Sequence, residues 1–334
     1  MIVGAITALG AAVTFAFNNA AFRRGALGGS VAQAMAIGMG IGVVLALVAV
    51  TLIGAWGNVF ALPRVSVGLL ALAGILHFAW GRYCNFRATK AMGSNMVGPL
   101  QQSSILLALA LAVFVLGEVI TPLRILGILL IILGPLVSLR AGRNARRAAE
   151  QGARPKGRAV FRPNLVEGYT FALLSVTGYG SSPILIRYSV QDAGLADSIA
   201  GWLIASVAAA MIIALTLLPR GRVAHVRAVD RSVGGWFALS GVLVGLSQML
   251  GFIALSFAPV TVVTPIQRLS LVIRVFANRL INRDHEVTGP RIWVATLVAM
   301  AGVLALTIST DVVTRALPLP DVMKQLLVWH WSFK

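Results

Sequence analysis

Acidic residues are scarce in this sequence, and none of them lies in the middle of an apolar segment. The 334 residues include 10 Asp and Glu against 28 Lys and Arg. The acids lie in loops or near the ends of apolar segments: Glu118, Glu150, Glu167, Asp192, Asp197, Asp230, Asp284, Glu286, Asp311 and Asp321. A carboxylate inside a membrane span is the usual group for exchanging a proton against a cationic substrate. Its absence argues against proton-coupled export of cations and leaves any coupling ion unidentified.

Cysteine is almost absent as well, with Cys84 as the single thiol. One cysteine excludes an intramolecular disulfide and argues against a metal or redox site. The sequence contains nothing like a phosphate-binding loop, a metal-ligand cluster or a nucleophile beside its base. We therefore expect no catalytic residues, no metal and no cofactor, and we do not expect nucleotide hydrolysis within this chain.

Charged residues of both signs make up only 11% of the chain, whereas hydrophobic residues make up 58% and the mean hydropathy is +0.88. A soluble domain carries roughly a quarter charged residues, so this composition indicates an integral membrane protein. The net charge of +18 is also typical of nucleic-acid-binding proteins. The arginines, however, gather at the ends of apolar segments, where orientation signals lie. We expect the lipid bilayer as a partner and no nucleic acid.

About ten apolar segments approach the length of about 20 residues that a spanning helix needs. They cover residues 2–22, 31–54, 67–86, 94–116, 122–139, 165–187, 198–218, 233–257, 260–281 and 290–309. The sequence therefore predicts an all-α integral membrane protein with ten transmembrane helices. Five helices lie in residues 1–139 and five in residues 164–309. A basic linker, residues 140–163, separates the two sets, and a polar tail, residues 310–334, follows.

The two sets of helices are related in sequence. The alignment has no gap over residues 88–104 and 254–270, and it pairs prolines and glutamines: Pro99 with Pro265, and Gln101 with Gln267. Further matches follow: Glu118 with Glu286, and Gly134 with Gly302. Matches over most of each half indicate a duplication. Because each half holds five spans, an odd number, we expect the second repeat to be inverted relative to the first.

The repeated proline and glutamine predict a binding site where the repeats meet. Pro99 and Pro265 each remove a backbone donor, which opens the helix ladder. Gln101 and Gln267 carry amide groups that hydrocarbon cannot satisfy, so they must face protein, water or a ligand. Such helix breaks at matching places in two repeats are typical of midplane sites in transporters.

Polar side chains within the spans define a candidate substrate pathway, because such groups face the bundle interior or a wet cavity. The selected residues are Asn18, Trp80, Arg82, Tyr83, Gln101, Gln102, Tyr179, Gln248, Gln267 and Arg268. Hydrogen bonding between helices is the alternative role for these groups, and for His77 it is the preferred one. Trp80 and Tyr83 share a helix face, where they either stack on a ligand ring or simply pack.

Two arginines lie in the ninth apolar segment. Arg268 and Arg274 are six residues apart, about 240° around a regular helix, so we expect them on different faces. Arg268 is the deeper candidate, and Arg274 is expected to pair elsewhere or to reach an interface. A guanidinium presents a fixed fork of donors suited to carboxylate or phosphate. The expected small-molecule substrate is therefore an anionic or zwitterionic metabolite.

Two aligned acids, Glu118 and Glu286, are each followed closely by a proline, Pro122 or Pro290. We expect each acid to lie in a tight turn, where the positive N-terminal end of the following helix favours its negative charge. A direct role in function is the alternative for both.

The order of spans resembles that of the EamA-type permeases of the drug/metabolite transporter superfamily. The motif residues behind this resemblance are Gly117, Glu118, Thr121, Gly127 and Gly134, with Glu286 and Gly302 in the second half, where Asp284 and His285 replace the expected pattern. The resemblance covers residues 4–309. It implies a ten-helix, alternating-access carrier in a bacterial inner membrane, with substrates such as amino acids, aromatic metabolites, sugars or drug-like compounds.

Other functions remain open. One is a multidrug or metabolite exporter, and another is a flippase in which arginines at helix ends hold the phosphate of a lipid. A membrane receptor or scaffold is an alternative outside transport. A membrane enzyme acting on lipid would need convergent nucleophile, acid or metal groups, which the sequence does not present.

Positive charges predict the orientation. Loops after odd-numbered spans hold roughly 19 Lys and Arg, whereas the other loops and both termini hold roughly 6. The linker, residues 140–163, contributes 8 of the first group, and we expect it to be solvated beside anionic headgroups. The positive-inside rule places the odd loops in the cytoplasm and both termini outside. Members of the resembled family usually have both termini inside.

Overall fold

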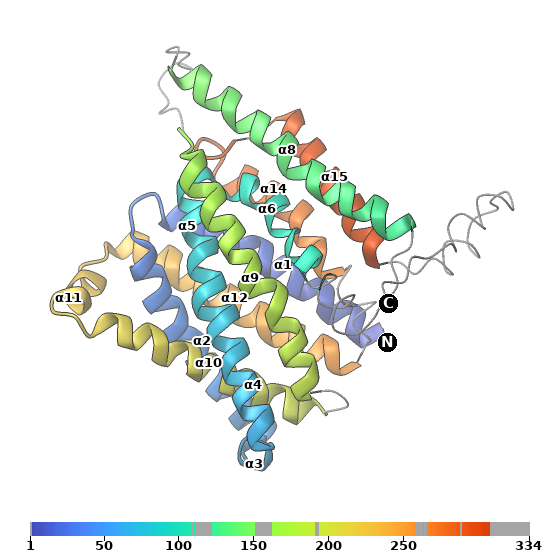
Figure 1. Cartoon of the computed structure of the whole chain (residues 1–334). Coiled ribbons are helices and arrows are strands. Elements are labelled where there is room, and N and C mark those ends of the chain that lie inside the picture. The colour runs from blue at the N-terminus through green and yellow to red at the C-terminus, as the bar shows by residue number, and fades with distance from the viewer. Residues whose placement is uncertain are drawn as a thin grey trace, which may run out of the picture.

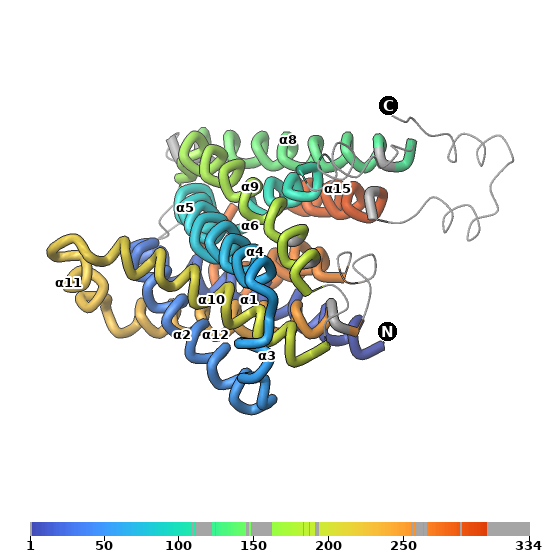
Figure 2. The backbone as a smooth tube through the Cα atoms, turned by 60° about the horizontal axis from the view of Figure 1, so that its bottom comes forward, coloured from blue at the N-terminus to red at the C-terminus, as the bar shows by residue number. Residues whose placement is uncertain are grey.

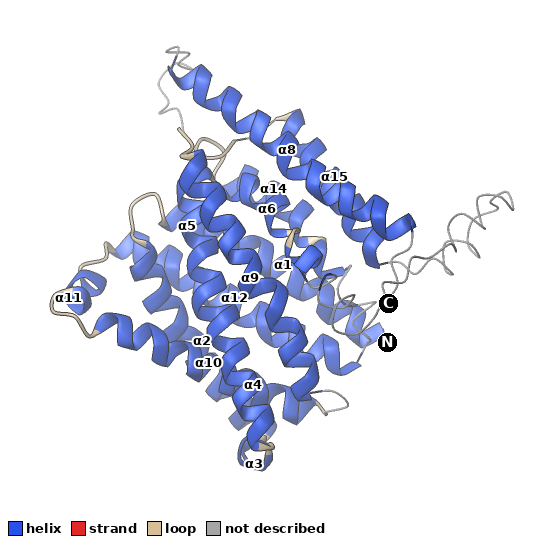
Figure 3. Cartoon of the chain, in the orientation of Figure 1, coloured by secondary structure: helices blue, strands red, loops and turns tan. Residues whose placement is uncertain are grey.

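A computed structural model describes residues 2–107, 110, 122–150, 162–190, 194–257, 263, 266–287 and 289–307. Within these ranges all regular secondary structure is helical, as Figure 3 shows. The predicted all-α class is therefore confirmed for the part of the chain that is described.

The described helices follow in this order along the chain. Up to residue 150 they are α1 (Ile2–Gly25), α2 (Val31–Ile53), α3 (Trp56–Ala61), α4 (Arg64–Gly74), the π-helix η1 (Ile75–Gly81), α5 (Arg82–Met92), α6 (Ser94–Gln101) and α8 (Pro122–Glu150). From residue 165 they are α9 (Leu165–Val190), α10 (Leu195–Leu217), α11 (Arg222–Arg227), α12 (Arg231–Phe257), α14 (Ser270–Ile281) and α15 (Pro290–Thr307).

Six helical stretches in the described residues are long and apolar enough to cross a membrane. They are Ile2–Gly25, Val31–Ile53, Arg64–Met92, Ile125–Asn144, Leu195–Leu217 and Arg231–Ala254. A shorter apolar helix covers Pro290–Ala305. The expected spans at 94–116, 165–187, 260–281 and 290–309 are not among the six, and each includes residues or side chains outside the described part. The count of ten therefore stays a prediction.

The long helices pack in a dense bundle (Figure 1). α1 packs against α12, α5 against α9, and α2 against both α10 and α12. α8 and α15 pack against each other and lie along one side of the molecule in both Figure 1 and Figure 2. Close approach depends on small residues, since Gly38 of α2 faces Gly241 of α12, and a Cβ on Gly241 would lie 3.0 Å from the Gly38 Cα.

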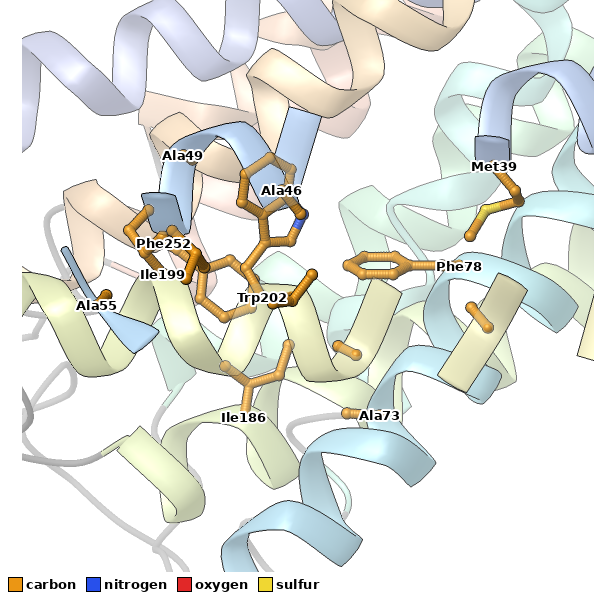
Figure 4. Packing of buried hydrophobic residues seen from close by; sticks show 14 of the residues in the cluster. Met39, Ala46, Ala49, Ala55, Ala73, Phe78, Ile186, Ile199, Trp202 and Phe252 are labelled. Carbon is orange, nitrogen blue, oxygen red and sulfur yellow. The ribbon is translucent and has the colours of Figure 1, made fainter. Parts of the chain in front are cut away.

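The largest apolar cluster holds the middle of the bundle together. Trp202 of α10 packs there with Phe78 of η1, Phe252 of α12 and Ile186 of α9, and alanines of α2 complete the cluster (Figure 4). Each of these side chains is at most 8% exposed. The cluster joins elements from both halves of the sequence. It thereby packs η1 against α2, α9, α10 and α12.

Candidate functional site

A pair of rings lies where η1 meets α9. The ring centroids of His77 and Tyr179 are 4.7 Å apart, and Nδ1 of His77 lies 2.6 Å from Oγ of Ser182. The two backbones approach closely at Gly178, where a Cβ would overlap the carbonyl oxygen of Leu76. η1 is a π-helix, a local distortion that is frequent at functional sites. The pair therefore marks the centre of the candidate site.

Three arginines lie within electrostatic range of one or both of these rings, and we call them the arginine cluster: Arg82, Arg268 and Arg274. Arg82 and Arg268 act electrostatically on His77, and Arg82 and Arg274 act on Tyr179. Arg82 is 7% exposed and Arg274 is 2% exposed, while Arg268 is half-buried. Arg82 begins α5, Arg274 lies on α14, and Arg268 lies in a helical stretch, residues 266–268, that precedes the turn at Leu269 and α14. Segments distant in sequence thus bring three positive charges into one region.

The partners of the buried arginines in the described residues are neutral groups. Nη1 of Arg274 donates to Oε1 of Gln101 at 2.9 Å, and its guanidinium lies 5.7 Å from the ring centre of Phe15. Nη1 of Arg82 lies 3.3 Å from Sδ of Met39, which is a weak acceptor. The Arg82 guanidinium also lies over the ring of Phe78 in η1, 5.3 Å from the ring centre. These contacts orient the cations without neutralising them.

The described carboxylates bind elsewhere in the molecule. Their positions are as follows: Glu286 beside Arg23, Glu167 paired with Arg87, Asp197 accepting from Asn58, Asp230 accepting from the backbone of Ser232, and Asp284 acting on His285. Glu286 also acts on Arg274 electrostatically, but its hydrogen bonds go to another helix. Among the described residues, the arginine cluster therefore carries more positive than negative charge.

Several buried polar atoms beside the cluster have no hydrogen-bond partner in the described part of the chain. They are Nε of Arg274, Nε2 of Gln101, Oε1 of Gln102 and Oγ of Ser104. An unsatisfied buried group costs about 1–3 kcal/mol, and more when it is charged. Such a concentration of unpaired donors and acceptors is expected where a ligand or ordered water completes the bonding.

The structure places four of the sequence-selected residues in this region: Arg82, Gln101, Tyr179 and Arg268. Gln102 caps the C-terminal end of α6, directly after Gln101, and its Nε2 donates to the carbonyl oxygen of Gly98 at 3.4 Å. α6 ends two residues after Pro99, and the following backbone bonds run to the third residue back. Pro265 lies outside the described residues.

The remaining selected residues have other surroundings. Asn18 is buried and accepts a hydrogen bond from Ser240 Oγ at 2.6 Å, which joins α1 to α12. Tyr83 is half-buried with its ring against Phe171. Trp80 is 42% exposed and donates to Oγ1 of Thr177 on the outside of the bundle. The structure does not bring these three to the cluster.

The last two selected glutamines are half-buried, Gln248 on α12 and Gln267 before α14. The amide nitrogen of Gln267 lies against Gly251, where an added Cβ would be only 3.1 Å away. Gln267 therefore packs on α12, beside Arg268 in sequence.

Sequence reasoning did not select Arg274 or His77. The expected separation of Arg268 and Arg274 on different faces assumed one regular helix. A turn at Leu269, which keeps the right-handed helical torsions φ −56° and ψ −23°, precedes α14, which begins at Ser270. The placement of the two arginines on different faces therefore stays a prediction. The available signal was an arginine within an apolar segment that contains no acid.

A second polar cluster, which we call the end cluster, joins α1, α6 and the loop after α14. Oε1 of Glu286 accepts from the backbone N–H of Ser94 at 2.6 Å, and Oε2 accepts from that of Asn95 at 3.1 Å. Nε of Arg23 lies 3.4 Å from Oε1 of the same carboxylate. Burial raises the pKa of Glu286 above its ordinary value, while Arg23 and the two N–H groups oppose that rise.

The end cluster corrects the expectation for this acid. Glu286 does lie at the N-terminus of a helix, but that helix is α6 and not α15, which begins at Pro290. Gly93 allows the approach, since its φ is 89° and a Cβ there would lie 2.6 Å from Oε2 of Glu286. The counterpart Glu118 lies outside the described residues.

A polar stripe on α14 connects the end cluster to the arginine cluster. Arg274, Asn278 and Asn282 are four residues apart and share one helix face. Nδ2 of Asn278 donates to Oδ1 of Asn95 at 2.9 Å, and Nδ2 of Asn282 donates to the carbonyl of Ala20 at 2.8 Å. α14 therefore holds α6 at two points, near its start and at Gln101.

Comparisons with known proteins agree with this architecture. Residues 2–140 match the model of the EamA-like transporter family. No significant match to a curated protein was found. Among solved structures 13 chains match. One is a crystal structure of a protein with 18% identity and a TM-score of 0.56, and the match covers 90% of this chain and 95% of that one. At this identity the likeness shows the fold alone.

Proposed function

Since residues 2–140 belong to the EamA-like transporter family of the drug/metabolite transporter superfamily, we propose that this protein is a secondary transporter of a small anionic or zwitterionic metabolite. The family match and the six apolar helices make it a multi-pass membrane protein. Transport proceeds by alternating access, with substrate held between the two repeats.

The observation that carries the anionic substrate is the arginine cluster. Arg82, Arg268 and Arg274 act electrostatically on the His77–Tyr179 pair, and the contacts of the two buried ones, Arg82 and Arg274, within the described residues are with neutral groups. An arginine at membrane depth is costly and normally binds a partner or lines a pathway. A carboxylate or phosphate on the substrate supplies the missing partner and fits the guanidinium fork.

The packing of the helices supports an inverted repeat. In the expected repeat, α1, α2, the α4–α5 segment, α6 and α8 correspond to α9, α10, α12, α14 and α15. Contacts made by helices of the first half have equivalents in the second. α1 packs on α12, and its counterpart α9 packs on the α4–α5 segment. In the same way α2 packs on α12 while α10 packs on α4, and α1 packs on α14 while α9 packs on α6. The pairs α2–α10, α6–α14 and α8–α15 join counterparts directly. A twofold axis produces this exchange of partners.

The proposed division of the chain follows from the same correspondence. Residues 1–139 and 164–309 form two five-helix repeats, which rock against each other around the site. The basic linker, residues 140–163, connects them, and the polar tail covers residues 310–334. α8 continues to Glu150, so the start of the linker is helical.

A ligand screen on the purified protein tests the proposed function. Binding raises the unfolding temperature by mass action, so we expect anionic or zwitterionic metabolites to stabilise the wild type more than neutral or cationic ones. Arg274→Gln should remove this stabilisation. Arg279→Gln is the matched control, because Arg279 is exposed on the same helix. Stabilisation by cations or neutral compounds alone would contradict the proposed function.

A further inference from the structure

We propose that the arginine cluster binds a ligand with two negative charges, such as a dicarboxylate or a phosphate monoester. This inference rests on the proposed function and narrows its substrate class from anions in general to dianions. It is carried by the charge balance of the cluster, by its unpaired donors and by the unequal contributions of the two halves.

The charge balance comes first. Arg82, Arg268 and Arg274 each act electrostatically on His77 or Tyr179 or on both. Their contacts within the described residues are a glutamine oxygen, a methionine sulfur and aromatic faces. Among the described carboxylates only Glu286 acts electrostatically on one of these arginines, Arg274, and its hydrogen bonds go to α6. A ligand with one negative charge would therefore leave at least one of the three cations without a counter-charge, whereas a dianion supplies two.

The donors lie on two separate elements, which suits two acidic groups or one phosphate. Arg82 is held on α5, whereas Arg274 and its partner Gln101 join α14 to α6. Nε of Arg274 and Nε2 of Gln101 are buried donors without a partner in the part of the chain that the structure describes. Arg274 and Gln101 are 2% and 5% exposed, so lipid and bulk water do not complete their bonding. Carboxylate or phosphate oxygens of a ligand would accept hydrogen bonds from these donors with good geometry.

The three arginines are not a by-product of duplication. In the alignment of the halves, Arg82 corresponds to Gln248 and Arg268 to Gln102. Arg274 corresponds to an apolar residue, Leu106 or Ala108, whichever spacing is used between the aligned motifs. Each arginine therefore stands where the other half has a neutral side chain. The cluster collects one cation from the first half and two from the second, so its charge belongs to the assembled site.

Matched pairs of probes test the charge of the ligand on wild-type protein. Succinate is compared with butyrate, and phenyl phosphate with benzoate, at pH 8 and equal ionic strength. We expect the dianion of at least one pair to raise the unfolding temperature at a concentration tenfold or more below that of its monoanion. A response to succinate alone assigns a dicarboxylate, and a response to phenyl phosphate alone assigns a phosphate monoester.

Variants then connect the preference to the cluster. Arg268→Gln should reduce the preference for the dianion at least fivefold while changing the response to the monoanion less than twofold. Arg279→Gln, at an exposed position of α14, should change neither. Equal responses to dianion and monoanion in the wild type would overturn this inference and leave the proposed function standing. If none of the four anions stabilises the wild type while a cation or neutral metabolite does, the proposed function itself fails.

Discussion

Arg274 and Gln101 form the hydrogen bond through which the arginine cluster reaches α6. The bond joins a buried guanidinium to a buried amide oxygen at 2.9 Å. A hydrogen bond to a charged group contributes about 1.5–3 kcal/mol. Because this bond also sets the direction of the fork, its loss affects ligand affinity as well as packing.

Gln101→Ala should therefore weaken binding of a stabilising anion about tenfold, while the protein still reaches the membrane in normal amounts. The measurement is the concentration of anion that gives half of the maximal thermal stabilisation. In an Arg274→Gln background, the same alanine substitution should lower the unfolding temperature of the ligand-free protein little further, because the bond is already lost. Independent, additive losses from the two substitutions would argue against a joint role.

Gly93 is a second single residue with a clear requirement. Its φ of 89° is strained for a side chain, and a Cβ would meet the Glu286 carboxylate. Gly93→Ala should therefore lower the free energy of unfolding by more than about 1 kcal/mol. Gly42→Ala is the control, because Gly42 lies within α2 with no atom within 4 Å of an added Cβ. That change should be neutral or stabilising by up to about 1 kcal/mol. Equal effects of both changes in thermal unfolding would contradict the role given to Gly93.

At the scale of elements, the end cluster ties α1, α5, α6 and the loop after α14. Nη1 of Arg23 donates to the carbonyl oxygens of Thr89 and Lys90, and Nη2 donates to that of His285 at 2.6 Å. Together with Glu286, this one side chain joins α1 to residues 89–95 and to the loop after α14. The hydrogen bonds of Arg23 join residues that are 66 to 262 positions apart in the sequence. The end cluster therefore acts as a tertiary restraint.

Removing Arg23 should be costly. Arg23→Gln leaves the buried Glu286 carboxylate without its cation, and breaking a buried pair in this way costs about 3–5 kcal/mol. Arg24→Gln is the control, because Arg24 is exposed on the same helix, and it should change stability by less than about 1 kcal/mol. Thermal unfolding in detergent gives both values.

The loss in Arg23→Gln should also depend on pH. Burial already raises the pKa of Glu286, and without Arg23 that pKa rises further. A carboxyl whose folded pKa is raised loses stability as pH rises through that folded value. The deficit relative to wild type should therefore be smaller at pH 5 than at pH 8. A deficit that is the same at both pH values would show that the carboxylate charge is not its cause.

Helices and their order were accessible from the sequence, whereas the directions of key side chains were not. Apolar length predicted six stretches that the described part of the structure shows as helices long and apolar enough to cross a membrane. Arg82, Gln101, Tyr179 and Arg268 were selected because polar groups in lipid need partners, and they lie in one region. Arg274 was considered but not selected, and the target of Glu286 was missed, because their contacts cross 173 and 192 residues and are tertiary features.

For the whole molecule, the distribution of positive charge predicts the orientation in the membrane. The end cluster gathers loops that follow odd-numbered expected spans, which are the basic ones. A reporter that is active only outside the cytoplasm should be active when fused after Lys334. The same reporter inserted within residues 151–161 should be inactive, because the basic linker is expected inside. The opposite pattern would show that the chain has the usual orientation of the resembled family.

The contact between Glu286 and α6 can form only late in synthesis of the chain. Asn95 is made 191 residues before the carboxylate that receives its N–H. At about 5–20 residues per second, the ribosome needs roughly 10–40 seconds to cover that interval. During this period the first half is already entering the membrane with the N-terminus of α6 uncapped. A nascent chain arrested before residue 286 would therefore expose this helix end to quality control, although all five expected spans of its repeat had been made.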